Sequence, residues 1–125
     1  HVDDYARALA TILDHGTPGE TYAVAGGFER TTLEVVTRVC SELDRARPSA
    51  SRYHELIRFE SSHPAHDRRH AVDATKLMCE LGWRPLASFD NGIRKTVEWY
   101  AEHGDWWQAA GPFERIDSAC PGRAA

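Results

Sequence analysis

The sequence predicts an α+β fold that is mostly helical and carries two or three short strands. Three observations predict it. Apolar residues recur at helical spacing in four stretches, two short segments are rich in residues that favour strands, and glycine or proline follows most of these stretches. A chain of 125 residues can bury one hydrophobic core but is too short for two. We therefore expect one domain over residues 1–115 and a disordered tail over residues 116–125, which lack periodicity.

A helix followed by a strand is expected at the start of the chain. Asp4 is a residue type that caps helices, and Gly16 is placed to end this one. The predicted apolar face of the helix consists of Ala6, Leu9, Ala10 and Leu13. Residues 21–25 then predict a short strand that ends at two glycines. This glycine pair lacks the spacing of a phosphate-binding loop, which indicates an ordinary turn.

A second helix is predicted from Thr31 to about residue 45. Thr31 and Glu34 have the spacing of a capping box, in which each side chain bonds to the backbone of the other residue. The apolar face of this helix consists of Leu33, Val36, Cys40 and Leu43. After a loop that contains Pro48, residues 56–59 are expected to form another short strand.

Two further helices are predicted in the second half of the chain. Asp73 is placed to cap the first of them and Gly82 to end it. The residues expected to face the core here are Leu77, Met78 and Leu81. Ser88 or Asp90 would begin the last main helix, and Gly104 would end it. The apolar stripe of that helix consists of Ile93, Val97, Tyr100 and Ala101.

The composition argues against several classes of function. The chain has 15 Lys and Arg residues against 19 Asp and Glu residues, a net charge of −4. That charge disfavours nucleic-acid binding, because phosphate contacts need a basic surface. No apolar run approaches the length of a membrane span. Cys40, Cys79 and Cys120 form no Cys-x-x-Cys pair, so we expect reduced, mostly buried thiols in a cytoplasmic protein.

Residues 63–70 hold three histidines and two arginines in a chain that is otherwise acidic. A loop that brings His66, Arg68 and Arg69 together could hold a diphosphate, because arginine offers a planar fork of donors to phosphate oxygens. Alternatively, the arginines pair with neighbouring carboxylates and only hold the loop in place. No metal site is expected, because Pro64 breaks the helical spacing and no cysteine or carboxylate completes the ligand set.

No catalytic residue is predicted in this chain. The sequence has no Tyr-x-x-x-Lys motif and no Gly-x-Ser-x-Gly elbow of a serine hydrolase. Trp106 and Trp107 form either a stacking platform for a sugar or base, or a packed helix end. The residues therefore point to binding rather than to catalysis.

Five segments carry a resemblance to a known family: DYARAL (4–9), GETY (19–22), HDRRHAVDATK (66–76), ELGWRP (80–85) and GIRKTVEWY (92–100). In this order they resemble the C-terminal third of dTDP-glucose 4,6-dehydratase, an extended short-chain dehydrogenase/reductase of the NAD-dependent epimerase/dehydratase family. The resemblance runs from His1 to about Gln108. Its most specific parts are HDRR and GWRP, which occur together and in order.

The resemblance implies a nucleotide-sugar-binding lobe that packs on an N-terminal Rossmann domain, which this sequence lacks. In the family that domain holds NAD and the catalytic Tyr and Lys. We therefore expect no cofactor on this chain, and NAD in the parent enzyme. The family reaction oxidises C4 of the sugar, eliminates water between C5 and C6, and returns the hydride to C6. Because the chain begins with His1, we expect that the front of a longer protein is missing.

The resemblance also implies substrate-binding positions. His66 matches a histidine that lies along the nucleotide diphosphate, and Arg68 and Arg69 match paired arginines with partly structural roles. His63 and Ala23 stand where the family has an Arg and an Asn that contact the nucleotide. Losing a charged hydrogen bond costs about 1.5–3 kcal/mol, so both exchanges are expected to weaken nucleotide binding.

Two hypotheses follow. The first is the dTDP-sugar-binding portion of a dTDP-glucose 4,6-dehydratase-like enzyme, inactive by itself. The second is a non-catalytic remnant or assembly module. In that case the apolar surface exposed by loss of the Rossmann domain would bind a protein partner or a second copy, giving a homo-oligomer.

Overall fold

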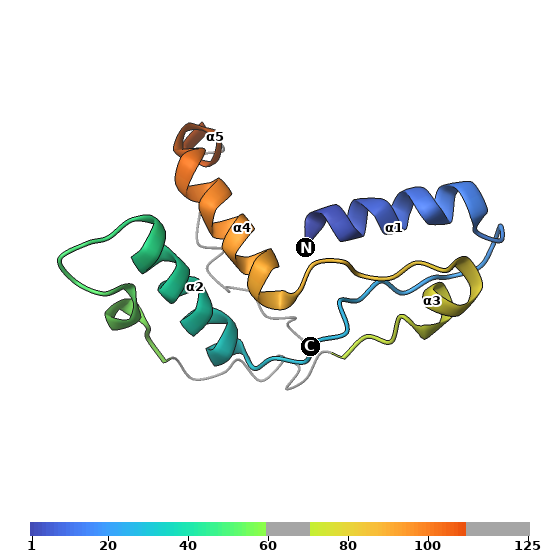
Figure 1. Ribbon diagram of the computed structural model, residues 1–125, viewed down its shortest axis with the longest axis horizontal. Helices are drawn as coiled ribbons and strands as arrows, with labels where there is room; N and C mark the ends of the chain where they lie inside the picture. The colour runs from blue at the N-terminus through green and yellow to red at the C-terminus, as the bar shows by residue number, and fades with distance from the viewer. Residues whose placement is uncertain (60–70, 110–125) are drawn as a thin grey trace, which may run out of the picture.

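The computed structural model describes residues 1–59 and 71–109. The chain is mostly helical there, as predicted, but no strand occurs in this part, so the two or three expected strands are wrong. The helices are α1 (Val2–His15), α2 (Thr32–Ala46), the 3-10 helix η1 (Tyr53–Leu56), α3 (Thr75–Leu81), α4 (Phe89–Glu102) and α5 (Gly104–Ala109). Figure 1 shows two helix pairs, α1 with α3 and α2 with α4, joined by long connections.

The two segments predicted as strands fail for different reasons. Leu56 ends η1, and residues 57–59 follow it without regular structure. Residues 21–25 have the composition of a strand, but within the described ranges none of their backbone groups has a backbone partner. A strand needs a neighbouring strand to bond its amides and carbonyls, so composition alone does not produce one.

Helix α1 begins earlier than predicted. His1 is its cap, because the His1 Nδ1 atom accepts a hydrogen bond from the Asp3 amide at 3.3 Å. Asp4 therefore lies inside the first turn and is not the cap. The predicted end is confirmed, since the Gly16 amide bonds to the Ile12 carbonyl at 2.7 Å and closes the last turn.

The apolar face predicted for α1 is also wrong. Leu9 is 51% exposed and Leu13 is 89% exposed. The buried face instead contains Ala8, which belongs to a core with α3 and the turn after it. The buried members of this core are Ala8, Ala74, Leu77 and Trp83. Because alanine is small, α1 can lie close to the indole of Trp83, and the larger residues of α1 point elsewhere.

Helices α2 and α4 begin where the sequence predicts. The capping box of α2 is confirmed: Thr31 Oγ1 accepts a hydrogen bond from the Glu34 amide at 3.2 Å, and the Thr31 amide donates to Glu34 Oε2 at 2.7 Å. Ser88 caps α4 by accepting from the Asn91 amide at 3.3 Å. The two helices pack against each other through local amphipathic faces, whose buried apolar members are Cys40 and Val97.

A buried carboxylate also joins α2 to α4. Glu42 on α2 is only 6% exposed and is paired with two arginines of its own helix. Arg38 lies 3.0 Å from one Glu42 oxygen, and Arg45 lies 2.8 Å from the other. Arg45 continues to Glu98 on α4 at 2.7 Å, and Arg38 lies 3.2 Å from Asp90. A buried charge is tolerated when it is paired in this way.

Helix α3 is short and keeps its predicted end. Gly82 follows it with φ of 67°, the left-handed conformation that glycine adopts without strain. At its start, Asp73 Oδ1 accepts hydrogen bonds from the Thr75 amide at 2.8 Å and from the Thr75 hydroxyl at 2.6 Å. The cap position itself is Ala74, so Asp73 acts one residue earlier than a standard cap.

Two smaller expectations need correction. Cys40 is buried, but Cys79 is an exposed thiol, because it lies on the outer face of α3; Cys120 lies outside the described residues. The predicted aromatic turn after Gly104 is the helix α5. Trp106 is 61% exposed and Trp107 is 42% exposed, but both contact the end of α4: the Trp106 ring lies 5.2 Å from the Trp99 ring, and Trp107 Nε1 donates to the Tyr100 carbonyl at 3.3 Å. The tail over residues 116–125 also lies outside the described residues.

Candidate functional site

A cavity of about 490 Å³ lies between the start of α1, the segment over residues 24–28 and the start of α4. We call it the α1–α4 cavity. Its lining is mostly apolar and includes four aromatic side chains, Tyr5, Phe28, Trp83 and Phe89. The lining residues most relevant to binding are Val24, Ala25, Gly26, Phe28, Trp83 and Phe89. Such a concave apolar surface is typical of small-molecule sites.

The aromatic rings give the cavity flat walls. Phe28 is half exposed, whereas Trp83 is almost fully buried. The guanidinium of Arg30 lies 5.6 Å from the centre of the Phe89 ring, which places a permanent positive charge beside an aromatic wall. Flat apolar walls with a nearby cation suit a ligand that combines a planar ring with an anionic group.

The glycine pair shapes one wall of the cavity. Gly27 has φ of +73°, which a residue with a side chain rarely adopts. A Cβ atom at Gly26 would lie 3.3 Å from the Phe28 ring, tighter than an ordinary contact. Gly27 is therefore needed for the backbone to turn here, and a side chain at Gly26 would require a small shift of the Phe28 ring beside the cavity.

Asp4 fixes the opposite wall. Its carboxylate accepts hydrogen bonds from the Leu86 amide at 3.0 Å and the Ala87 amide at 2.9 Å. Arg7 donates to the same carboxylate at 2.5 Å. The Leu86 amide, followed by the Ala87 amide and Arg7, lowers the pKa of Asp4 to about 2, although burial acts in the opposite direction. Asp4 is thus a permanent anion that ties α1 to the turn before α4.

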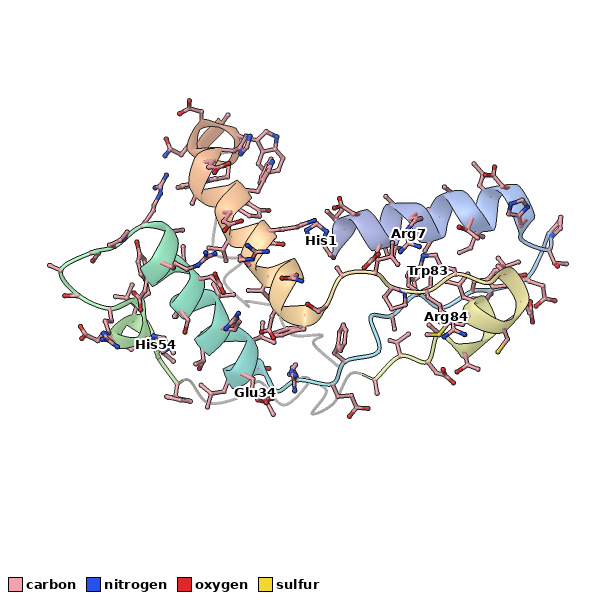
Figure 2. All side chains as sticks on the ribbon, viewed as in Figure 1. His1, Arg7, Glu34, His54, Trp83 and Arg84 are labelled. Carbon is pink, nitrogen blue, oxygen red and sulfur yellow. The ribbon has the colours of Figure 1, made fainter. Side chains whose placement is uncertain are left out.

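Arg7 and Trp83 complete this connection. Figure 2 shows Arg7, Trp83 and Arg84 gathered between α1 and α3. Arg7 donates to the Arg84 carbonyl at 2.8 Å, and its guanidinium lies 5.7 Å from the centre of the Trp83 ring. The Trp83 Nε1 atom is buried and has no hydrogen-bond partner in the described part of the chain. Arg7 therefore holds Trp83, a lining residue of the cavity, against α1.

Most of the predicted site residues lie outside the described residues. These are His63, His66, Arg68 and Arg69. Ala23 is described and is exposed, but it does not line the α1–α4 cavity, whereas the next residues, Val24 and Ala25, do. Among residues 1–59 and 71–109, no group of three His, Cys, Asp or Glu side chains could hold a metal ion.

Sequence reasoning missed several residues of the site. Phe28 and Phe89 lie at or next to predicted element ends, where no periodicity marks them. Asp4 was predicted to cap a helix, but it binds the backbone amides of a distant turn. Local sequence could not indicate this role, because those amides are more than 80 residues away in the sequence. One signal for the site was present in the GWRP segment. A tryptophan in a turn formed by glycine and proline suggests that its side chain is held in place by packing against the rest of the fold.

The comparisons with known proteins identify the family. Residues 1–96 match the family model described as GDP-mannose 4,6 dehydratase. This match covers more than half of the chain, so the chain belongs to that family of nucleotide-sugar dehydratases.

Within the family, the similar proteins are dTDP-glucose 4,6-dehydratases. A probable dTDP-glucose 4,6-dehydratase of Sinorhizobium fredii is 55% identical over 108 residues, which cover 86% of this chain and 31% of that protein. The dTDP-glucose 4,6-dehydratase of Salmonella typhimurium is 47% identical over 106 residues, 85% of this chain and 29% of that protein. The resemblance seen in the sequence is thereby confirmed.

A solved structure agrees. The dTDP-glucose 4,6-dehydratase of Bacillus anthracis, solved in complex with NAD, superimposes with a TM-score of 0.74 at 32% identity, and covers 87% of this chain and 32% of that chain. This chain thus spans about a third of the length of the relatives it matches. None of the helices in the described ranges has the length and apolar character needed to cross a membrane.

The helix that follows the glycine pair does not fit the pyrophosphate of a dinucleotide such as NAD. A pyrophosphate would need the free N-terminus of the helix that follows the glycine pair. That helix is α2, and its N-terminus is occupied by a carboxylate: Glu34 Oε2 accepts from the Thr31 amide at 2.7 Å and from the Thr31 hydroxyl at 2.9 Å. The Thr31 amide, followed by the hydroxyl, lowers the pKa of Glu34, so a negative charge already stands where the phosphates would lie.

Proposed function

We propose that this chain is the substrate-binding portion of a dTDP-glucose 4,6-dehydratase-like enzyme, which dehydrates dTDP-glucose to the 4-keto-6-deoxy sugar. One observation carries the proposal. The α1–α4 cavity is built on the segment that directly follows Ala23, a position where the resemblance implies a nucleotide contact. The relatives with that name support the choice of substrate.

In this proposal the cavity binds the flat part of the ligand. Phe28 and Phe89 supply aromatic surfaces for the base, and Arg30 supplies charge close to them. Stacking on an aromatic side chain contributes about 1–3 kcal/mol per base. The diphosphate would be bound by His63, His66, Arg68 and Arg69, as the resemblance implies. Ala23 would leave one family contact unmade.

The chemistry would lie elsewhere in the polypeptide. Hydride transfer needs NAD and a Tyr-x-x-x-Lys pair, and this chain offers no such pair. We therefore propose that residues of the kind found in the other two thirds of the relatives supply the redox centre, in a cytoplasmic enzyme. This chain would hold and orient the nucleotide sugar, and would not catalyse its dehydration alone.

Isothermal titration of the chain with dTDP and with dTDP-glucose tests the binding. The Phe28→Ala variant should bind about tenfold more weakly, because it loses one stacking surface. The matched control is Phe59→Ala, since Phe59 is 82% exposed and does not line the cavity; its affinity should not change. A folded sample that releases no heat at millimolar ligand would rule out binding by this chain alone.

A second candidate function is assembly, and a specific observation favours it. Large apolar residues are exposed at helical spacing along α1, namely Val2, Tyr5, Leu9 and Leu13. Apolar surface of this extent usually meets another protein. We propose that the chain, if it has lost its redox half, persists as a self-associating module. A monomer at every concentration in analytical ultracentrifugation would rule this candidate out.

A further inference from the structure

A second cavity adjoins the α1–α4 cavity. Its volume is about 560 Å³, which lies in the range of small-molecule sites. It is formed by the start of α1, the second half of α4 and one side chain of α5, and we call it the α4–α5 pocket. The lining residues that matter for binding are Asp3, Lys95, Thr96, Trp99, Tyr100 and Trp106. Neither candidate function assigns it a ligand.

One face of α4 continues from the first cavity into the second. Phe89 lines the α1–α4 cavity, Thr96 lines both, and Trp99 lines the α4–α5 pocket. These positions are seven and three residues apart, so they lie on one side of the helix. The His1 side chain, only 9% exposed, lines both cavities between the start of α1 and α4 (Figure 2). A Cβ atom at Gly92 would lie 3.5 Å from His1 Cβ, so His1 marks the junction of the two cavities.

Aromatic rings form one wall of the α4–α5 pocket. The Trp106 ring lies 5.2 Å from the Trp99 ring at an interplanar angle of 74°, and 6.3 Å from the Tyr100 ring at 72°. Two such edge contacts fix the plane of the Trp106 indole. Because the indole is already oriented, a ligand that stacks on it pays little entropy to order the wall.

The other groups of the pocket are polar and come from two helices. Asp3 belongs to α1 and Lys95 to α4. Asp3 Oδ2 lies 3.2 Å from His1 Nδ1, which leaves Asp3 Oδ1 as an acceptor. The Thr96 hydroxyl donates to the Gly92 carbonyl at 2.9 Å, and its oxygen can still accept. The pocket therefore offers an anion, a cation and a hydroxyl oxygen beside a flat apolar wall.

This mixture of groups distinguishes between possible ligands. An apolar segment of protein would take Asp3 and Lys95 out of water without giving them hydrogen-bond partners, which is costly. A phosphate would be attracted by Lys95 but repelled by the Asp3 carboxylate. A saccharide ring carries hydroxyls that can donate to Asp3 and accept from Lys95, and hydrogen bonds to charged groups are the strong ones. The C–H groups of the same ring can cover the indole of Trp106.

We propose that the α4–α5 pocket binds a pyranose ring, which stacks on Trp106 and bonds through its hydroxyls to Asp3 and Lys95. Two sources can supply such a ring: a free saccharide, or the sugar end of a nucleotide sugar whose base lies in the α1–α4 cavity. Along α4, Phe89 and Trp99 are about 15 Å apart, a separation that a ribose and a diphosphate can bridge. Only the second source rests on the proposed function.

NMR titrations with methyl α-D-glucopyranoside, dTDP and dTDP-glucose test the pocket and separate the sources. The indole N–H signals of the four tryptophans are the probes. The Trp106 signal should shift with methyl α-D-glucopyranoside if the pocket takes free saccharides, or with dTDP-glucose and not with dTDP if it takes the sugar end. Trp107 does not line the pocket, so its signal should stay in place. Trp83 lines the α1–α4 cavity and reports separately on the base.

Three variants test the contacts with the same ligands. Trp106→Ala should weaken binding of the sugar-bearing ligand about three- to tenfold, and Trp106→Phe should keep most of the affinity because it retains a flat ring. Trp107→Ala is the matched control on the neighbouring residue and should leave the affinity unchanged. Lys95→Met keeps the length of the side chain but removes its charge, so it should weaken sugar binding and leave the affinity for dTDP unchanged.

The possible failures are distinguishable. A Trp106 signal that stays in place with both sugar-bearing ligands would overturn the inference, whatever dTDP does to the Trp83 signal. A shift of the same size with glycerol, which has hydroxyls but no ring, would overturn it as well. If dTDP and dTDP-glucose move no signal at all, the proposed function fails, and the titration with methyl α-D-glucopyranoside alone decides whether the pocket binds a pyranose.

Discussion

The two helix pairs of this protein are held together by different kinds of contact. The α1–α3 pair depends on contacts between residues far apart in the sequence: Leu77 is fully buried against α1, and Asp4 bonds to amides 82 and 83 positions away. The α2–α4 pair depends on amphipathic helix faces with an ion-pair network around Glu42. The first pair is therefore specified by long-range geometry and the second mostly by local sequence pattern.

Leu77→Ala should have the largest effect among the variants that test this difference between the two helix pairs. Removing a fully buried leucine leaves a cavity and should lower the free energy of unfolding by about 2–5 kcal/mol. The matched control is Leu13→Ala, which makes the same change at a position that is 89% exposed and should change stability by less than about 0.5 kcal/mol. Urea unfolding followed by circular dichroism measures both.

The same variant can show whether the two pairs are separate units. Native-state hydrogen exchange should speed up first at amides of α1 and α3, while amides of α2 and α4 keep more of their protection. Equal acceleration in all four helices would contradict the distinction, because it would mean that both pairs unfold together.

Asp4→Asn should have the next largest effect. The change removes the charge that pairs with Arg7 and weakens the bonds to the backbone amides of Leu86 and Ala87, so we expect a loss of about 1.5–3 kcal/mol. Asp3→Asn is the control, because the Asp3 side chain is 73% exposed and should be nearly neutral. If both variants unfolded at the same urea concentration as the unmodified chain, the link from α1 to the turn before α4 would carry no energy.

The pH dependence of the Asp4 effect has a definite sign. The pKa of Asp4 is about 2 in the folded chain, against an ordinary value of 3.8. Its carboxylate therefore stabilises the fold above pH 3.8, and this contribution is lost as the pH falls from 3.8 toward 2. The difference in stability between the unmodified chain and Asp4→Asn should shrink over that interval.

These contacts explain which parts of the fold the sequence could predict. The capping box of α2 needs only residues within one turn, so Thr31 and Glu34 were sufficient to locate it. The buried face of α1 was missed because Leu9 and Leu13 have the right spacing, but Ala8 is the residue that fits against Trp83. Residues 21–25 look like a strand in composition, and only a missing partner strand keeps them from being one.

The candidate site, too, could be predicted only in part from local sequence. The resemblance pointed to Ala23, which directly precedes two lining residues of the α1–α4 cavity, Val24 and Ala25, and its role in binding stays a prediction. The aromatic walls could not be foreseen, because Phe28 and Phe89 come together from segments 61 residues apart in the numbering of the sequence. A local sequence pattern predicts helices and strands, but it does not predict which distant residues line the same cavity.

The smallest expected effect concerns the capping box of α2, which belongs to the helix pair specified by local sequence. Glu34→Ala removes one half of the capping box and should lower the urea midpoint of unfolding, by less than the two variants above. Glu34→Gln should retain most of the stability, because a glutamine oxygen can still accept from the Thr31 amide. Glu102→Ala is a matched control at the other end of a helix, where a negative charge is not favoured by the helix dipole. Urea unfolding at pH 7 measures all three variants. A Glu34→Ala variant as stable as the Gln variant would mean that the α2–α4 pair does not depend on its local cap.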